Sequence, residues 1–96
     1  MTTHIIAYLL AQKNKFETRT KELETEHDML KATLSEINVY MDKNKNTPYL
    51  GRIRRRINGN IVSIQRKIVD NKNNLANISR AHDYMTNLIR PASPTS

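Results

Sequence analysis

Apolar residues recur every seven positions along the first half of the chain, in two interleaved rows. The rows alternate at spacings of three and four residues, which is the pattern of a helix that packs against another helix. One row is apolar throughout, whereas the middle of the other is polar. The rows are Leu9, Phe16, Leu23, Leu30 and Ile37, and Ile6, Lys13, Thr20, His27, Leu34 and Met41. The pattern predicts one helix over about residues 3–42.

A second heptad pattern follows Thr47 and Pro48. Threonine is a favoured N-cap and proline is well tolerated at the first helical position, so this pair marks a helix start. The helix should end near Arg90, because a residue that precedes proline is disfavoured in the helical region. Its rows are Leu50, Ile57, Ile64, Asn71, Ile78 and Met85, and Ile61, Ile68, Leu75, His82 and Ile89, with Ile53 close by. We predict a helix over about residues 48–90, with Gly59 as its weakest point.

The link between the two predicted helices, residues 43–47, is short, which favours antiparallel neighbours. We therefore predict an all-α fold, an antiparallel two-helix hairpin that is coiled-coil-like and forms a single domain over residues 1–90. Folding about residues 46–47 would pair positions whose numbers add up to about 94. The Pro- and Ser-containing segment 91–96 is predicted to be a disordered tail.

Length and composition exclude several classes of protein. A chain of 96 residues fits one small domain. The absence of cysteine excludes a disulfide scaffold, a thiolate zinc site and a cysteine nucleophile. The apolar stretch 5–11 is too short for a membrane span, and no basic residue precedes it as in a signal peptide. We expect a cytoplasmic protein that does not enter the membrane.

The net charge of +7 is distributed unevenly. Residues 1–46 hold seven basic and seven acidic side chains, whereas residues 47–96 hold nine basic and two acidic ones. From Lys43 to Lys67 there are eight basic residues and no acidic residue. Such a basic segment favours an anionic partner.

The basic residues of the second helix gather on its outward side. At 100° per residue, Arg52, Arg55 and Arg56 lie within about 100° of arc, opposite the isoleucines. A guanidinium group suits both phosphates and carboxylates, so the partner is either a nucleic-acid backbone or an acidic protein. A solvated face that only keeps the protein soluble is the third interpretation. The predicted anion-binding residues are Lys43, Lys45, Arg52, Arg55, Arg56, Arg66 and Lys67.

Aromatic residues do not alternate with these basic residues, as they would in a protein that stacks on single-stranded nucleic acid. We expect Tyr49 to be the only aromatic residue near these basic residues. Motifs that read base sequence, such as a zinc finger, are also absent from the sequence. Any contact with nucleic acid is therefore expected to be with the backbone.

The end of the hairpin that holds the termini carries more apolar residues than one helix pair can bury. We predict a protein–protein interface there, either with another protein or with a second copy, since two hairpins would make a four-helix bundle. The predicted interface residues are Ile5, Leu10, Met85, Leu88 and Ile89. The alternative is that the termini fold back or simply expose a few apolar groups.

The sequence gives no pattern for catalysis. His27 and His82 would lie several turns apart, and Glu26-His27-Asp28 lacks the second histidine of a helical zinc motif. A glycine-rich phosphate loop is absent, and the acidic residues between 22 and 28 spread around the helix. We expect no enzymatic activity, metal, cofactor or small-molecule substrate.

These features favour a non-enzymatic binding or regulatory protein, most simply an accessory of nucleic-acid-processing machinery. A first alternative is a small inhibitor of the kind that phages encode against host DNA-processing enzymes. A second alternative is a structural coiled-coil subunit or secretion-type chaperone, whose arginines would contact an acidic protein.

Overall fold

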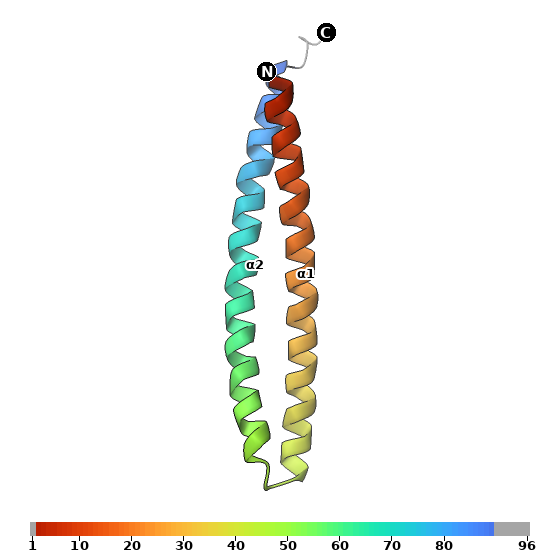
Figure 1. The fold of residues 1–96 in the computed structure, drawn as a ribbon, viewed down its shortest axis with the longest axis vertical. Helices are drawn as coiled ribbons and strands as arrows, with labels where there is room; N and C mark the ends of the chain where they lie inside the picture. The colour runs from red at the N-terminus through yellow and green to blue at the C-terminus, as the bar shows by residue number, and fades with distance from the viewer. Residues whose placement is uncertain (1, 90–96) are drawn as a thin grey trace. The chain divides into compact units, whose positions relative to one another are not determined.

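Two α-helices make up nearly all of the described chain. The computed structural model describes residues 2–89, in which α1 spans Thr2–Lys43 and α2 spans Pro48–Ile89. A short turn joins them (Figure 1). The prediction of an all-α helical hairpin is confirmed. The predicted tail over residues 91–96 lies outside the described residues.

The chain divides into two compact units, each built from a segment of both helices. Residues Lys21–Val69, which include the turn, form what we call the tip unit. The other unit comprises Met1–Thr20 and Asp70–Ser96, of which residues 2–20 and 70–89 are described, and we call it the end unit. The single domain over residues 1–90 stays a prediction.

Burial follows the predicted heptad rows in both units. The most buried apolar side chains are Leu23, Ile57, Ile61 and Ile64, all in the tip unit. The described heptad residues, all buried or half-buried, are Ile6, Leu9, Lys13, Phe16, Thr20, Leu23, His27, Leu30, Leu34, Ile37 and Met41 in α1, and Leu50, Ile57, Ile61, Ile64, Ile68, Asn71, Leu75, Ile78, His82 and Met85 in α2. We call these residues the heptad core. α2 continues through Gly59 without a break, so this glycine does not divide the helix.

An arginine extends the heptad core toward the turn. Arg54 precedes Ile61 by one heptad and is half-buried, whereas Ile53, which the sequence placed close to the core, is 44% exposed. The Arg54 Nη1 group donates a hydrogen bond of 3.4 Å to the Asn38 side-chain oxygen on α1. Between the buried isoleucines and the turn, the two helices are therefore joined by a polar contact.

Contacts between the helices fix their register within the tip unit. His27 Nε2 lies 3.2 Å from Gln65 Nε2, Arg54 bonds to Asn38, and a Cβ added to Gly51 would lie 3.9 Å from Met41 Cε. In each of the three pairs the residue numbers add up to 92, compared with the predicted value of about 94. The cause is the turn, because its residues 44–47 are centred one residue earlier than the predicted fold point.

Polar groups of the turn hold the ends of the two helices. Asn44 donates from its backbone and its side-chain nitrogens to the Tyr40 carbonyl oxygen, both at 3.0 Å. Thr47 stands at the predicted N-cap position before Pro48, and its hydroxyl donates to the Asn44 carbonyl oxygen at 3.4 Å. The Thr47 hydroxyl thus stabilises the turn. The Thr47 backbone carbonyl oxygen accepts a hydrogen bond from the Gly51 amide at 3.2 Å.

Over the described residues, neither α1 nor α2 contains an apolar segment long enough to cross a membrane.

The end unit buries three side-chain atoms that have no hydrogen-bond partner among the described residues, one each on Thr20, His82 and Thr86. Thr20 is only 6% exposed, and its hydroxyl has no hydrogen-bond partner among the described residues. A buried hydroxyl that forms no hydrogen bond costs about 1–3 kcal/mol of stability. This position should therefore favour an apolar side chain of similar shape.

We expect the Thr20→Val variant to raise the free energy of unfolding by about 1 kcal/mol, because it removes this unpaired hydroxyl. Thermal or urea unfolding followed by circular dichroism measures the change. Thr25→Val is the matched control, since the Thr25 hydroxyl is exposed and already donates to the Lys21 carbonyl at 3.0 Å. A Thr20→Val protein less stable than the wild type would contradict the account.

Candidate functional site

The seven predicted basic residues all belong to the tip unit, and all are exposed. Lys43 ends α1, Lys45 lies in the turn, and the others lie on α2. Within the described part of the chain, none of the seven forms an ion pair. They are Lys43, Lys45, Arg52, Arg55, Arg56, Arg66 and Lys67. Their charges are therefore available to an external anion.

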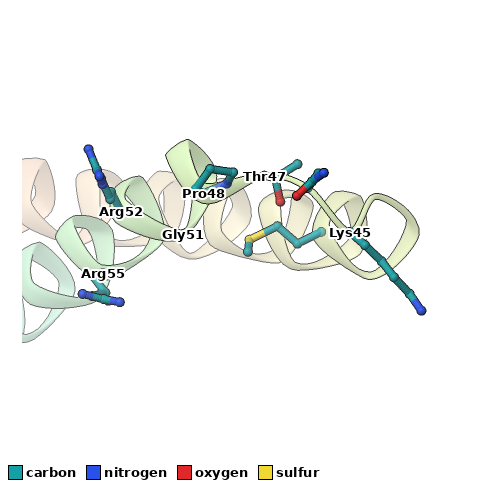
Figure 2. A pocket seen from close by; sticks show the side chains of 8 residues that line it. Lys45, Thr47, Pro48, Gly51, Arg52 and Arg55 are labelled. Carbon is teal, nitrogen blue, oxygen red and sulfur yellow. The ribbon is translucent and has the colours of Figure 1, made fainter.

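Three of these residues line one hollow beside the turn. Lys45, Arg52 and Arg55 surround an open space of about 630 Å³ (Figure 2). The remaining lining residues are Met41, Asn46, Thr47, Pro48 and Gly51. Figure 2 shows Arg52 and Arg55 projecting from α2 in different directions, while Lys45 extends away from both. The cationic groups diverge, which suits several phosphates of an extended polyanion better than one small enclosed anion.

Beyond this hollow, basic side chains continue around the outward side of α2. By helical geometry Arg56 and Lys67 lean toward one flank of the heptad core, while Arg55 and Arg66 lean toward the other. Gly59 lies between these residues, and a Cβ added there would meet no atom within 4 Å. The middle of this basic surface is therefore open to a ligand.

Sequence reasoning missed an aromatic residue of this region. Tyr40 of α1 is 52% exposed and lines a hollow of about 520 Å³ together with Leu50 of α2. Tyr49 is the chain neighbour of Leu50 and is 76% exposed. The expectation of Tyr49 as the only aromatic residue nearby is therefore wrong, because Tyr40 lines a hollow with Lys43. Two signals were available, namely the position of Tyr40 three residues before Lys43 and the antiparallel register, which brings the end of α1 beside the start of α2.

A carboxylate also belongs to this region. Glu36 lines the hollow of Tyr40 and Leu50, and it lines a second hollow with Tyr40 and Lys43. Its negative charge disfavours phosphate inside these hollows, where an uncharged group is better accommodated. The tip therefore combines a partly apolar hollow with cationic surroundings.

The predicted apolar interface residues of the end unit divide between the core and the surface. Ile5, Leu10 and Leu88 are 47%, 45% and 59% exposed. Met85 is half-buried in the heptad core, so it offers only part of its side chain. The Ile89 side chain lies outside the described residues.

The exposed apolar residues of the end unit do not share one side. Around α1, Ile5 and Leu10 lie about 140° apart, on opposite flanks of the core. Tyr8, which is 63% exposed, lies on the flank of Ile5. On α2, Tyr84 and Leu88 take the equivalent flank, with Tyr84 64% exposed. In an antiparallel pair equivalent flanks face the same way, so the larger apolar surface consists of Ile5, Tyr8, Tyr84 and Leu88.

Two of the described histidines, His27 and His82, lie close to other side chains of the protein, although the buried His82 Nδ1 has no hydrogen-bond partner among the described residues. His27 contacts Gln65 across the helices, and its Nδ1 lies 3.8 Å from the Asp28 carboxylate. His82 Nδ1 lies 3.7 Å from the Asp83 carboxylate. Among the residues that the structure describes, no group of three or more side chains could hold a metal ion.

If the apolar surface of the end unit joins two copies of the chain, Leu88→Glu should weaken self-association by about tenfold or more, because it places a charge in a desolvated contact. Sedimentation equilibrium over a range of concentrations measures this effect. Asn87→Glu is the matched control, since it introduces the same charge at an exposed position about 100° away. Equal dissociation constants for both variants would exclude Leu88 from the interface.

Comparison with protein-family models, curated proteins and solved structures yields no match for this chain. The residues of the tip unit and their geometry therefore carry the functional proposal. Those residues provide seven exposed cationic groups, two exposed tyrosines and a partly apolar hollow beside the turn.

Proposed function

We propose that this chain is a non-enzymatic binding protein whose tip unit contacts the phosphate backbone of nucleic acid. The observation that carries the proposal is the set of seven exposed basic side chains, none in an ion pair within the described residues, between Lys43 and Lys67. Backbone contacts of this kind release counterions and provide affinity that is independent of base sequence.

The spacing of the arginines suits a polymer. Arg52 and Lys67 are separated by about 22 Å along α2, at 1.5 Å per residue. This distance corresponds to about six nucleotides of one strand at 3.4 Å each. Basic groups that diverge along this length can each reach a different phosphate.

The end unit supplies the second half of the proposed function. Its exposed surface of Ile5, Tyr8, Tyr84 and Leu88 suits contact with a protein, since tyrosine and large aliphatic residues are common in interface cores. A protein with both surfaces would act as an accessory or regulatory subunit of nucleic-acid-processing machinery.

The competing functions differ in what the basic residues contact. A small inhibitor of a DNA-processing enzyme, a structural subunit or a secretion-type chaperone would direct the arginines toward carboxylates of a protein. Guanidinium groups serve either anion, so direct measurement of nucleic-acid binding separates these functions.

Replacement of Arg52, Arg55 and Arg56 by Ser should weaken nucleic-acid binding by about tenfold or more at about 50 mM salt. The slope of log affinity against log salt should become shallower by about three, because each arginine that is replaced no longer neutralises a phosphate. Fluorescence anisotropy with labelled oligonucleotides over a salt series measures both quantities.

The matched control replaces Lys15, Lys21 and Arg80 by Ser, which removes the same charge at exposed positions outside residues 43–67. The control should retain most of the affinity. Equal losses of affinity in the two variants would mean that only the net charge matters. Absence of binding by the wild type at low salt would overturn the proposed function and favour an acidic protein partner.

A further inference from the structure

Tyr40 and Tyr49 face the same side of the tip unit. Around α1, Asn38 lies about 100° to one side of Ile37 and Tyr40 about 60° to the other. The hydrogen bond from Arg54 to Asn38 shows that the Asn38 side of α1 faces the Arg54 side of α2. Around α2, Arg54 and Tyr49 lie on opposite sides of Leu50. Both tyrosines therefore lie on the flank opposite the Arg54–Asn38 contact.

The surface beside Tyr40 is partly apolar and accessible. Tyr40 and Leu50 line the hollow of about 520 Å³, and Ile53, 44% exposed, lies on the same flank of α2. With 52% and 76% exposure, the two rings have free surface to offer a ligand. A site that binds only a single anion would not require two aromatic rings.

Basic side chains border the tyrosines. Around α2, Arg56 lies about 20° and Arg52 about 60° from Tyr49. Lys43 lines the neighbouring hollow with Tyr40. The flank thus combines two aromatic rings with three cations, which is the composition of a binding site for single-stranded nucleic acid.

We infer that this flank binds single-stranded nucleic acid, with Tyr40 and Tyr49 stacking on bases and Lys43, Arg52 and Arg56 contacting the phosphates. The inference rests on the proposed function and specifies its substrate class. Base faces are exposed in a single strand and covered by neighbouring base pairs in a duplex, so only a single strand can use the tyrosine rings. Glu36 in the hollow of Tyr40 favours an uncharged base over a phosphate at that place.

Charge argues against a second copy of the chain as the occupant of this flank. A two-fold symmetric contact sets each surface against its own equivalent. The three cations of this flank would then approach the equivalent cations of the second copy, namely Lys43, Arg52 and Arg56. Glu36 is the acidic residue that lines the two hollows beside Tyr40. Like charges brought together in this way disfavour association.

Anisotropy with a labelled single strand of about 12 nucleotides and the matching duplex tests the inference. The wild type should bind the single strand more tightly. Tyr40→Ala with Tyr49→Ala should lower single-strand affinity about tenfold or more, because stacking on each base is worth about 1–3 kcal/mol. Duplex affinity should change less than about threefold, since phosphate contacts remain. The Tyr40→Phe, Tyr49→Phe protein should bind like the wild type.

The matched control is Val62→Ala with Val69→Ala, which truncates two exposed apolar side chains of α2 away from the tyrosine flank. Tyrosine emission gives a second measurement, because the chain has four tyrosines and no tryptophan. In a Tyr8→Phe, Tyr84→Phe protein the two tip tyrosines are the remaining emitters, and a single strand should quench them.

Three outcomes are decisive. Preference for the single strand that disappears in the alanine variant supports the inference. Equal binding of single strand and duplex, unchanged by the alanine variant, overturns the inference and leaves backbone binding intact. Failure of both nucleic acids to bind at low salt overturns the inference together with the proposed function.

Discussion

The packing of one heptad stripe on each helix is the constraint on which the other features depend. In the tip unit, Leu23 and the isoleucines at 57, 61 and 64 are buried between α1 and α2. A pair of helices can bury one stripe per helix, so side chains elsewhere remain exposed. Arg52, Arg55 and Arg66 of α2 lie on the side opposite its isoleucines, whereas Arg54 extends the core. The geometry that creates the core therefore also determines which charges a ligand can reach.

The turn brings residues from the end of α1 and the start of α2 together on one surface. Asn44 and Thr47 hold it by hydrogen bonds, and α2 then starts beside the last turns of α1. Tyr40 before the turn thereby lines a hollow with Leu50, the chain neighbour of Tyr49, after it. Each helix contributes one of the two tyrosines, Tyr40 from α1 and Tyr49 from α2. A site that uses both requires the antiparallel register, with paired residue numbers that add up to 92 in the tip unit.

Features that depend on heptad periodicity could be predicted from the sequence, whereas features that depend on register could not. The helix start at Pro48 and the burial of the heptad positions follow from local residue chemistry. The position of Arg54 beside the heptad rows follows from the same periodicity, whereas its bond to Asn38 depends on a residue of the other helix. Tyr40 was missed because its proximity to Leu50 is fixed by the turn, whose exact centre sets the register.

Backbone amide chemical shifts, measured during titration with a short single-stranded oligonucleotide, test the central claim most directly. The account predicts changes on both sides of the turn, in the last turns of α1 and in residues 48–67 of α2. Residues 2–20 and 70–89 of the end unit should remain unchanged. Changes confined to the end unit, or none at all under low-salt conditions, would contradict the account.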